Sequence, residues 1–246
     1  MREILFIADD FGLSPEINAA IVHAHRHGVL DGASLMFGQP GTADAVRLAR
    51  EHPTLLIGWH LHLNDSTPVT VPAWPWGRSP ARAGWALGLS GAARELMRRE
   101  VNAQWRMFCK TGLRCAFFNS HHHLHSHPLV YPQVLRALGG GFKGWLRLGR
   151  PMSFDRRRRA LALGSGLLGW LGERRRRRCP FRTSRTLWGL DRLERMDAAE
   201  IAAILPRLPR GLHEFMFHPR APDDGDRDTA ALLRLHELLP ELRRRK

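Results

Sequence analysis

Residues 4–12 limit the fold of this chain more than any other part of its sequence. They read Ile-Leu-Phe-Ile-Ala-Asp-Asp-Phe-Gly, so an apolar run ends directly in two adjacent carboxylates. A continuous apolar run is typical of a strand that is buried on both faces of a parallel sheet, and ligands usually bind at the carboxyl ends of such strands. The sequence therefore predicts a buried strand that delivers Asp9 and Asp10 to a functional edge of a sheet.

A helix is predicted directly after this strand. Ser14 and Pro15 are typical of an N-cap and a first helical residue, and Gly28 is a typical end. The alternation of strand and helix then recurs along the chain. We expect strands at 33–37, 55–59, 116–118, 145–148 and 213–217, and helices at 42–51, 92–111, 129–138 and 230–239, with a further helix that begins at Asp197. The proline-rich segment 68–85 is predicted to be an irregular loop over the site.

This alternation favours an α/β fold with a parallel sheet. Because polar clusters follow at least four strand ends, we expect a single-domain (β/α) barrel-like fold over residues 1–246, and a closed or nearly closed barrel over an open sheet. Residues 150–182 contain eleven arginines against two acidic residues, and we interpret them as a basic insertion in this domain.

Composition narrows the cellular setting and the partners. No apolar run is long enough to span a bilayer, no signal pattern precedes the first strand, and the three cysteines lack C-x-x-C spacing, so a cytoplasmic location is expected. For the arginine blocks we rank a solvated face first, peripheral contact with an anionic membrane surface second, and nucleic acid third. No nucleic-acid partner is therefore expected, and a homo-oligomer is compatible with the sequence.

The carboxylates and histidines at the strand ends predict a metal site. Asp9 and Asp10 repel each other unless a cation or a shared proton offsets their charges, and Ser14 already caps the next helix. His60 and His62 share a face if the third strand stays extended. Five histidines fall within residues 121–127, and at least one is expected to coordinate or titrate.

One carboxylate with two imidazoles is a usable ligand set for a divalent cation, and it leaves positions for water and substrate. Imidazoles favour Zn²⁺, Ni²⁺, Co²⁺ or Cu²⁺, while a carboxylate with several waters could hold Mg²⁺, so Zn²⁺ and Mg²⁺ both stay open. His218 follows the strand at 213–217, and that position favours a catalytic role. The acidic run 223–228 lacks the spacing of a calcium loop and is predicted to be a solvated turn.

The chain resembles the YdjC-like carbohydrate deacetylases, a family that includes the ChbG and HpnK groups. The matching pieces are residues 8–14 with Asn18, 28–36, 58–61, 120–125 with Pro128, and 214–219. Asn119 stands where many members have an aspartate, which is more similar to the hopanoid-biosynthesis-associated HpnK branch than to the chitooligosaccharide one. His62 is a second departure from the family pattern.

The resemblance implies a barrel-like fold and a metal-dependent N-deacetylase that removes acetyl from an N-acetylated amino sugar. The sugar would be an N-acetylglucosamine-type glycoside or a lipid-linked form such as a hopanoid glycoside. By position, Asp10, His60 and His121 would bind the metal, Asp9 would be the general base, and His218 the general acid. The rival interpretations are another metal-dependent hydrolase, such as a phosphoesterase, and a basic lipid-binding or nucleic-acid-binding protein.

Overall fold

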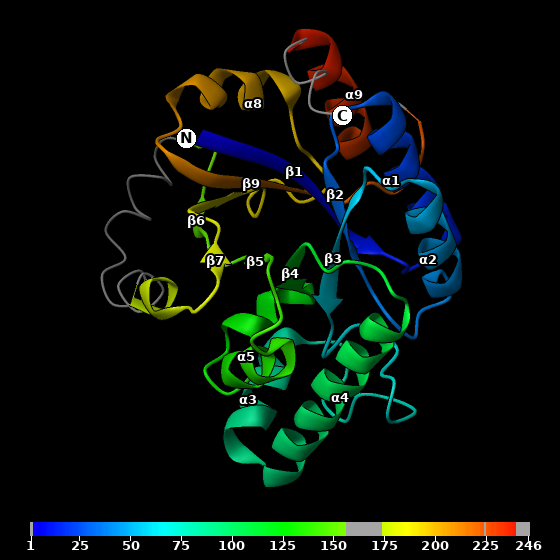
Figure 1. The fold of residues 1–246 in the computed structure, drawn as a ribbon, viewed down its shortest axis with the longest axis vertical. Coiled ribbons are helices and arrows are strands. Elements are labelled where there is room, and N and C mark those ends of the chain that lie inside the picture. The colour runs from blue at the N-terminus through cyan, green and yellow to red at the C-terminus, as the bar shows by residue number, and fades with distance from the viewer. Residues whose placement is uncertain (1, 156–173, 224, 240–246) are drawn as a thin grey trace.

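The computed structural model describes residues 2–155, 174–223 and 225–239 of the 246-residue chain. Within them, one nine-stranded sheet runs in the order β6-β8-β9-β1-β2-β3-β4-β5-β7, and its strands pair in parallel (Figure 1). The strands are β1 Arg2–Phe11, β2 Gly32–Leu35, β3 Leu56–Leu61, β4 Phe117–Ser120, β5 Trp145–Leu146, β6 Arg150–Met152, β7 Arg182–Thr183, β8 Thr186–Trp188 and β9 Gly211–Phe217.

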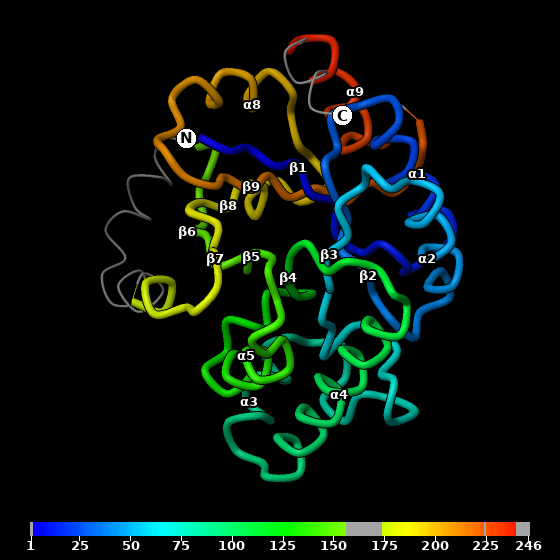
Figure 2. Tube along the Cα trace, viewed as in Figure 1, coloured from blue at the N-terminus to red at the C-terminus, as the bar shows by residue number. Residues whose placement is uncertain are grey.

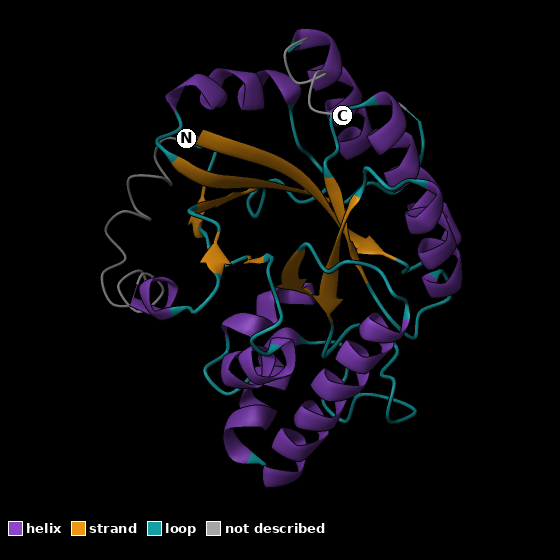
Figure 3. Ribbon diagram, in the orientation of Figure 1, coloured by secondary structure: helices purple, strands orange, loops and turns teal. Residues whose placement is uncertain are grey.

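The sheet lies at the centre of the molecule, and helices surround it (Figure 3). They are α1 Pro15–His27, α2 Thr42–Glu51, α3 Pro80–Leu89, α4 Gly91–Lys110, α5 Tyr131–Leu138, α8 Ala198–Ile204 and α9 Arg227–Leu238, with the 3₁₀ segments η1 His121–Ser126 and η2 Leu205–Arg207. The predicted α/β, barrel-like, single-domain fold is confirmed. Among the described residues, β6 and β7 lie at the two ends of the strand order, so the expected closed or nearly closed barrel takes the form of a curled half-barrel.

The core is centred on β1, which lies beside β9 (Figure 2). Their register runs from Arg2 opposite Gly211 to Ala8 opposite Phe217. Phe6 and Phe215 meet with their ring centroids 5.5 Å apart. Both faces of β1 are buried from Ile4 onward, which explains why this strand reads as an unbroken apolar run.

Local sequence signals placed most helices correctly. Ser14 caps α1 by accepting a hydrogen bond from the backbone amide of Ile17, and Asp197 caps α8 by accepting one from Glu200. The predicted helix at 42–51 coincides with α2. Ser14 and Asp197 each place a side-chain oxygen where the unpaired backbone amides of a helix need a partner, while α2 begins after Gly41 without a side-chain cap.

The prediction of an irregular loop over residues 68–85 was wrong at its end. Residues from Pro80 onward form α3, which is capped by the Ser79 hydroxyl. Proline is tolerated at the first helical position because no hydrogen bond is made there, so Pro80 begins the helix and does not prevent it.

The arginine-rich region 150–182 contributes its two ends to the sheet as β6 and β7. Residues 156–173, which hold the arginines at 156–159 and the apolar run 161–171, lie outside the described residues. The basic insertion stays a prediction. Within the described parts of the chain, no helix is both long and apolar enough to cross a membrane.

Candidate metal centre and active site

The parallel sheet gathers the predicted site residues at its carboxyl edge. Asp9 and Asp10 come near the end of β1, His60 near the end of β3, and His121 directly after β4. The register pairs His60 with Asn119 on the neighbouring strand. Residues far apart in the chain meet here because every strand of a parallel sheet ends at the same edge.

A local irregularity in β1 lets two adjacent carboxylates serve one site. The register between β1 and β2 shifts between Ala8 and Phe11, and Asp10 has a φ of +66°. A left-handed backbone is strained for a residue other than glycine, and such strain is often found at functional sites. The bulge changes the alternation of side chains that a regular strand would impose.

Asp10, His60 and His121 form a compact group that could hold a cation. The Asp10 Oδ1 atom lies 3.1 Å from His121 Nδ1 and 3.4 Å from His60 Nε2. One ligand atom from each residue lies within 4.8 Å of the others. The structure thus brings together the three residues predicted as ligands, and the identity of the metal stays a prediction.

The hydrogen bonds around His60 suit a metal ligand. The Asn119 amide nitrogen donates to Asp9 Oδ1 at 2.9 Å, so its oxygen must face His60 Nδ1, 2.6 Å away. The Ser34 hydroxyl, which donates to Asp9 Oδ1, lies 3.0 Å from the same Nδ1. Nδ1 therefore carries the proton, and the buried Nε2, which has no hydrogen-bond partner among the described residues, keeps its lone pair free.

The short distances between Asp10 and the two imidazoles also shift the pKa values of these groups. Burial opposes ionisation of Asp10, but the neighbouring imidazoles of His121 and His60 hold its pKa well below the usual value. Burial also opposes the charged form of His121, yet Asp10 raises the pKa of that imidazole. The ionised carboxylate of Asp10 therefore makes a positive charge favourable at this position.

Asp9 lies in a buried network of its own. Arg147 Nη1 donates to Asp9 Oδ2 at 2.5 Å and Nη2 donates to Oδ1 at 2.9 Å, while Nε donates to Glu214 Oε1 at 2.6 Å. Burial would raise the pKa of Asp9, but the Arg147 guanidinium beside it keeps that pKa far below its usual value. Burial raises the pKa of Glu214 against the pull of the same guanidinium. Asp9 is therefore ionised at neutral pH without any metal.

Arg147 is the main site residue that sequence reasoning missed. Its side chain is only 2% exposed, and it directly follows β5. The sequence predicted only a strand at this position. A charged residue inside an apolar strand pattern is a usable signal, because arginine is almost never fully buried unless it is paired. Ser34 was missed for a different reason, since a serine in a strand carries no such signal.

The other predicted histidines near the site are structural. His62 lies between the Phe37 carbonyl and the Ser66 hydroxyl, and burial lowers its pKa to about 3. His125 lies between the Ser120 hydroxyl and the Arg147 carbonyl, and burial lowers its pKa to about 4. Both imidazoles stay neutral, and His125 supports the backbone of the arginine that holds Asp9.

Asp65, His121 and His122 form a second group with metal-ligand chemistry. In this group, Asp65 and His122 already have other partners. Asp65 forms an ion pair with Arg78. The Asn64 amide nitrogen donates to the Arg78 carbonyl and lies 2.8 Å from His122 Nδ1, so it donates to that atom as well. In the neutral ring the proton then lies on Nε2, which leaves no free lone pair for a cation.

His218 follows β9, as predicted, and lies close enough to Asp9 for its charge to favour the ionised carboxylate. Its Nδ1 is buried and has no hydrogen-bond partner within the described ranges. Its backbone amide donates to Asp228 Oδ2 at 2.6 Å. Because Asp228 is fully buried, the prediction of a solvated turn over 223–228 was wrong for this residue.

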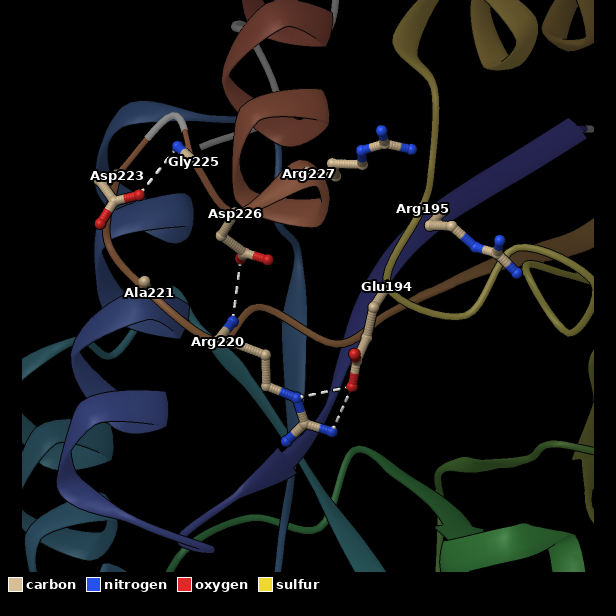
Figure 4. Close-up of a pocket in the computed structure, with 8 residues that line it drawn as sticks. All are labelled: Glu194, Arg195, Arg220, Ala221, Asp223, Gly225, Asp226 and Arg227. Carbon is tan, nitrogen blue, oxygen red and sulfur yellow. Dashed lines mark hydrogen bonds and ion pairs between the residues drawn. The ribbon is translucent and has the colours of Figure 1, made fainter.

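Arg220 closes the site on the side of β9. Its Nη2 lies 3.2 Å from Asp10 Oδ2 and 2.9 Å from Glu194 Oε1. The guanidinium also borders a cleft of about 660 Å³ (Figure 4). Asp10 therefore turns one oxygen toward the two imidazoles and the other toward Arg220. Sequence reasoning missed Arg220 because nothing distinguishes it from the many other arginines of this chain.

Together, the parallel half-barrel and its edge define an α/β protein with a candidate site for one divalent cation beside an arginine-paired carboxylate. The chain belongs to the YdjC-like protein family, whose model matches residues 3–243.

Curated relatives support this placement. A carbohydrate deacetylase of Brevibacillus brevis is 42% identical over 136 residues, 54% of each chain. Those of Geobacillus stearothermophilus and Vibrio cholerae are 40% and 35% identical over 136 and 142 residues. The matched part spans about half the length of these relatives. The crystal structure of a proposed cellobiose-phosphate cleavage protein of Enterococcus faecalis V583 is similar to this chain, with a TM-score of 0.69 and 21% identity. The match covers 98% of this chain and 95% of that one. This likeness supports the fold.

Proposed function

We propose that this chain is a metal-dependent carbohydrate N-deacetylase that releases acetate from an N-acetylated amino sugar of the N-acetylglucosamine type. The observation that carries the proposal is the Asp10, His60 and His121 group, in which a buried imidazole nitrogen has a free lone pair. A carboxylate and two imidazoles are a donor set for Zn²⁺, with Mg²⁺ as the alternative. When bound, such a cation polarises a carbonyl group and lowers the pKa of water.

The chain's own residues would supply the proton transfers. Asp9 is ionised and adjacent to the cation ligands, so it can accept a proton from the attacking water. Arg147 holds both of its oxygens in place, and Glu214 shares the charge of that guanidinium. His218, which follows β9, the strand beside β1, would give a proton to the departing amine. Its backbone is fixed by Asp228.

Asp9→Asn separates binding from chemistry. We expect the variant to keep its metal, because Asp9 is not among the ligands, and to lose acetate release from N-acetylglucosamine conjugates. Metal content and acetate are measured on the same sample. Unchanged turnover would remove Asp9 from the mechanism, and release of phosphate from phosphoesters without acetate release would favour a phosphoesterase. Ligand binding that weakens with salt and survives loss of Asp10 and His60 would favour a basic binding protein.

We propose further that the amino sugar is linked to a lipid, as in a hopanoid glycoside of the HpnK branch, and that the protein contacts an anionic membrane at its cytoplasmic face. The support is α3, where Trp85 and Leu89 are 72% and 81% exposed on a helix that packs against η1, the segment beginning at His121. An apolar helix face with an exposed tryptophan suits an interface with lipid.

Turnover on soluble and lipid-linked forms of one sugar tests this second proposal. We expect Trp85→Ala with Leu89→Ala to slow only the lipid-linked form, while Leu193→Ala, an exposed leucine elsewhere on the surface, changes neither rate. Equal loss on both forms would refute the lipid contact. Dissociation of a dimer by the double variant in gel filtration would assign this face to a second copy of the chain.

A further inference from the structure

The amino ends of β8, β9 and β1 lie side by side at the edge of the sheet opposite the candidate metal centre (Figure 1). Arg2 begins β1, while Arg185 and Arg210 directly precede β8 and β9. Neighbouring strands of a sheet lie only about 4.8 Å apart, so the three arginines share this edge. Arg2 and Asp10 are eight residues apart in β1, and a strand of that length separates the two edges of the sheet by roughly 25 Å.

None of these three arginines has a carboxylate partner in the parts of the chain that the structure describes. All three residues are exposed, and the hydrogen bonds of their side chains go only to backbone carbonyls there. Glu3 follows Arg2 in β1, but its carboxylate pairs with Arg182. Positive charges that lie close together repel each other, so an anion at this edge would be bound favourably.

Backbone carbonyls hold two of the guanidinium groups in the same way. Arg2 Nη1 donates to the Pro206 carbonyl at 2.8 Å and lies 3.4 Å from that of Leu208. Arg185 Nη1 donates to the Arg210 carbonyl at 3.2 Å. The Nε and Nη2 atoms lie on the other side of a guanidinium, where their N–H groups are parallel. Both arginines therefore keep a free edge with two parallel donors, and such an edge binds phosphate in a bidentate manner.

Gly211 brings these two arginines to one place at the start of β9. A Cβ atom at Gly211 would lie 2.9 Å from Arg185 Cδ, so the Arg185 side chain crosses the strand directly against this glycine, which has a φ of +134°. Arg2 is the register partner of Gly211 on β1. Burial lowers the pKa of His213, and the charges of Arg185 and Arg2 lower it further. Both guanidinium groups thus lie near the same imidazole.

We propose that this amino edge of the sheet is a binding site for a phosphate group, held by the free Nε and Nη2 edges of Arg2 and Arg185 with the positive charge of Arg210 beside them. A carboxylate has two oxygens and is satisfied by one such edge, whereas a phosphate group has enough oxygens to accept from two. A free phosphate ester and the headgroup of an anionic phospholipid share this chemistry. The proposal does not depend on the deacetylase function, because the two sites lie at opposite edges of the sheet.

Titration calorimetry with glycerol 1-phosphate tests the free form of the ligand. Arg2→Met and Arg185→Met should each weaken binding about tenfold, because each removes a pair of charge-assisted donors. Arg99→Met and Arg106→Met remove the same charge from exposed positions on α4 and should leave the Kd unchanged. His60→Ala should also leave the Kd unchanged, because that residue belongs to the other edge of the sheet.

Arg185→Lys separates geometry from charge. Lysine keeps the positive charge but lacks the two parallel donors, so binding should stay about fivefold weaker than in the parent protein. Full recovery of affinity in Arg185→Lys, or equal weakening by Arg99→Met, would reduce the effect to net charge and overturn the proposed site. Binding that is lost in His60→Ala but kept in Arg185→Met would place the phosphate at the candidate metal centre and overturn it as well.

Vesicle flotation distinguishes the two sources of the phosphate group. Capture of the protein by vesicles of phosphatidylglycerol in phosphatidylcholine that is lost in Arg185→Met, and kept in Arg99→Met, would assign the site to a lipid headgroup. Binding of glycerol 1-phosphate without such capture would assign it to a free ester. If neither probe binds, the proposal is refuted. Acetate release by the wild-type chain is measured separately, so this failure would leave the proposed function standing.

Discussion

Asn119 is expected to set metal affinity without touching the metal. Its side-chain oxygen accepts from His60 Nδ1 at 2.6 Å, which leaves Nε2 of that ring unprotonated. Loss of such a partner typically weakens metal binding by about 10- to 100-fold. Because the Ser34 hydroxyl stays 3.0 Å from the same nitrogen, we expect Asn119→Ala to lie near the lower limit, about tenfold, or about 1.4 kcal/mol.

Competition with a chromogenic chelator measures this change in the Kd for Zn²⁺. Asn102→Ala, an exposed asparagine on α4, is the matched control and should leave the Kd unchanged. The decisive comparison is a double-mutant cycle with His60→Ala. If Asn119 acts through the imidazole, its substitution should cost nothing further once that ring is gone. A tenfold penalty that persists in the His60→Ala background would refute the tautomer argument.

Two further predictions concern stability. His125 is protonated near pH 6.5 when unfolded but only near pH 4 when folded, so the unfolded state binds more protons as the pH falls, and stability decreases below about pH 6.5. Between pH 7.5 and 5 this histidine should account for about 2 kcal/mol of the loss in urea unfolding, and an equal loss in His125→Asn would contradict it. Gly58→Ala places a methyl group 2.3 Å from the Phe117 ring and should lower the free energy of unfolding by about 1–3 kcal/mol. Gly88 lies in α3 with open space around it, so Gly88→Ala should raise the free energy of unfolding by about 0.5–1 kcal/mol. A destabilising Gly88→Ala would argue against a helix at that position.

The parts of the fold that could be predicted are those with local causes. The Ser14 cap and the Asp197 cap lie within one turn of the helices they begin, so the sequence alone contains both partners of each hydrogen bond. The apolar run of β1 reflects burial on both faces. A metal site of one carboxylate and two imidazoles could be expected because the parallel sheet brings the predicted strand ends together, while the family resemblance implied the particular group Asp10, His60 and His121.

The parts that could not be predicted depend on contacts between distant residues. Asp9 and Arg147 are 138 positions apart, and no local pattern connects a carboxylate on one strand with a guanidinium after another. The +66° φ of Asp10 results from how β1 pairs with β2, which a single strand does not reveal. The start of α3 was missed because the prolines before Pro80 were taken to represent the whole segment, although proline position within a helix matters more than proline content.

The buried arginine changes the interpretation of the two adjacent acids. From the sequence, a cation or a shared proton was expected to offset the repulsion between Asp9 and Asp10. In the structure each carboxylate has its own compensating charges: Arg147 holds Asp9, while Asp10 is flanked by the imidazoles and by Arg220. Glu214 also pairs with Arg147 and compensates part of the positive charge of the guanidinium. The guanidinium therefore orients Asp9 without neutralising it completely. The edge of the sheet is therefore arranged electrostatically before any cation binds, and preorganisation of this kind is what lets charged groups act on a substrate without first rearranging.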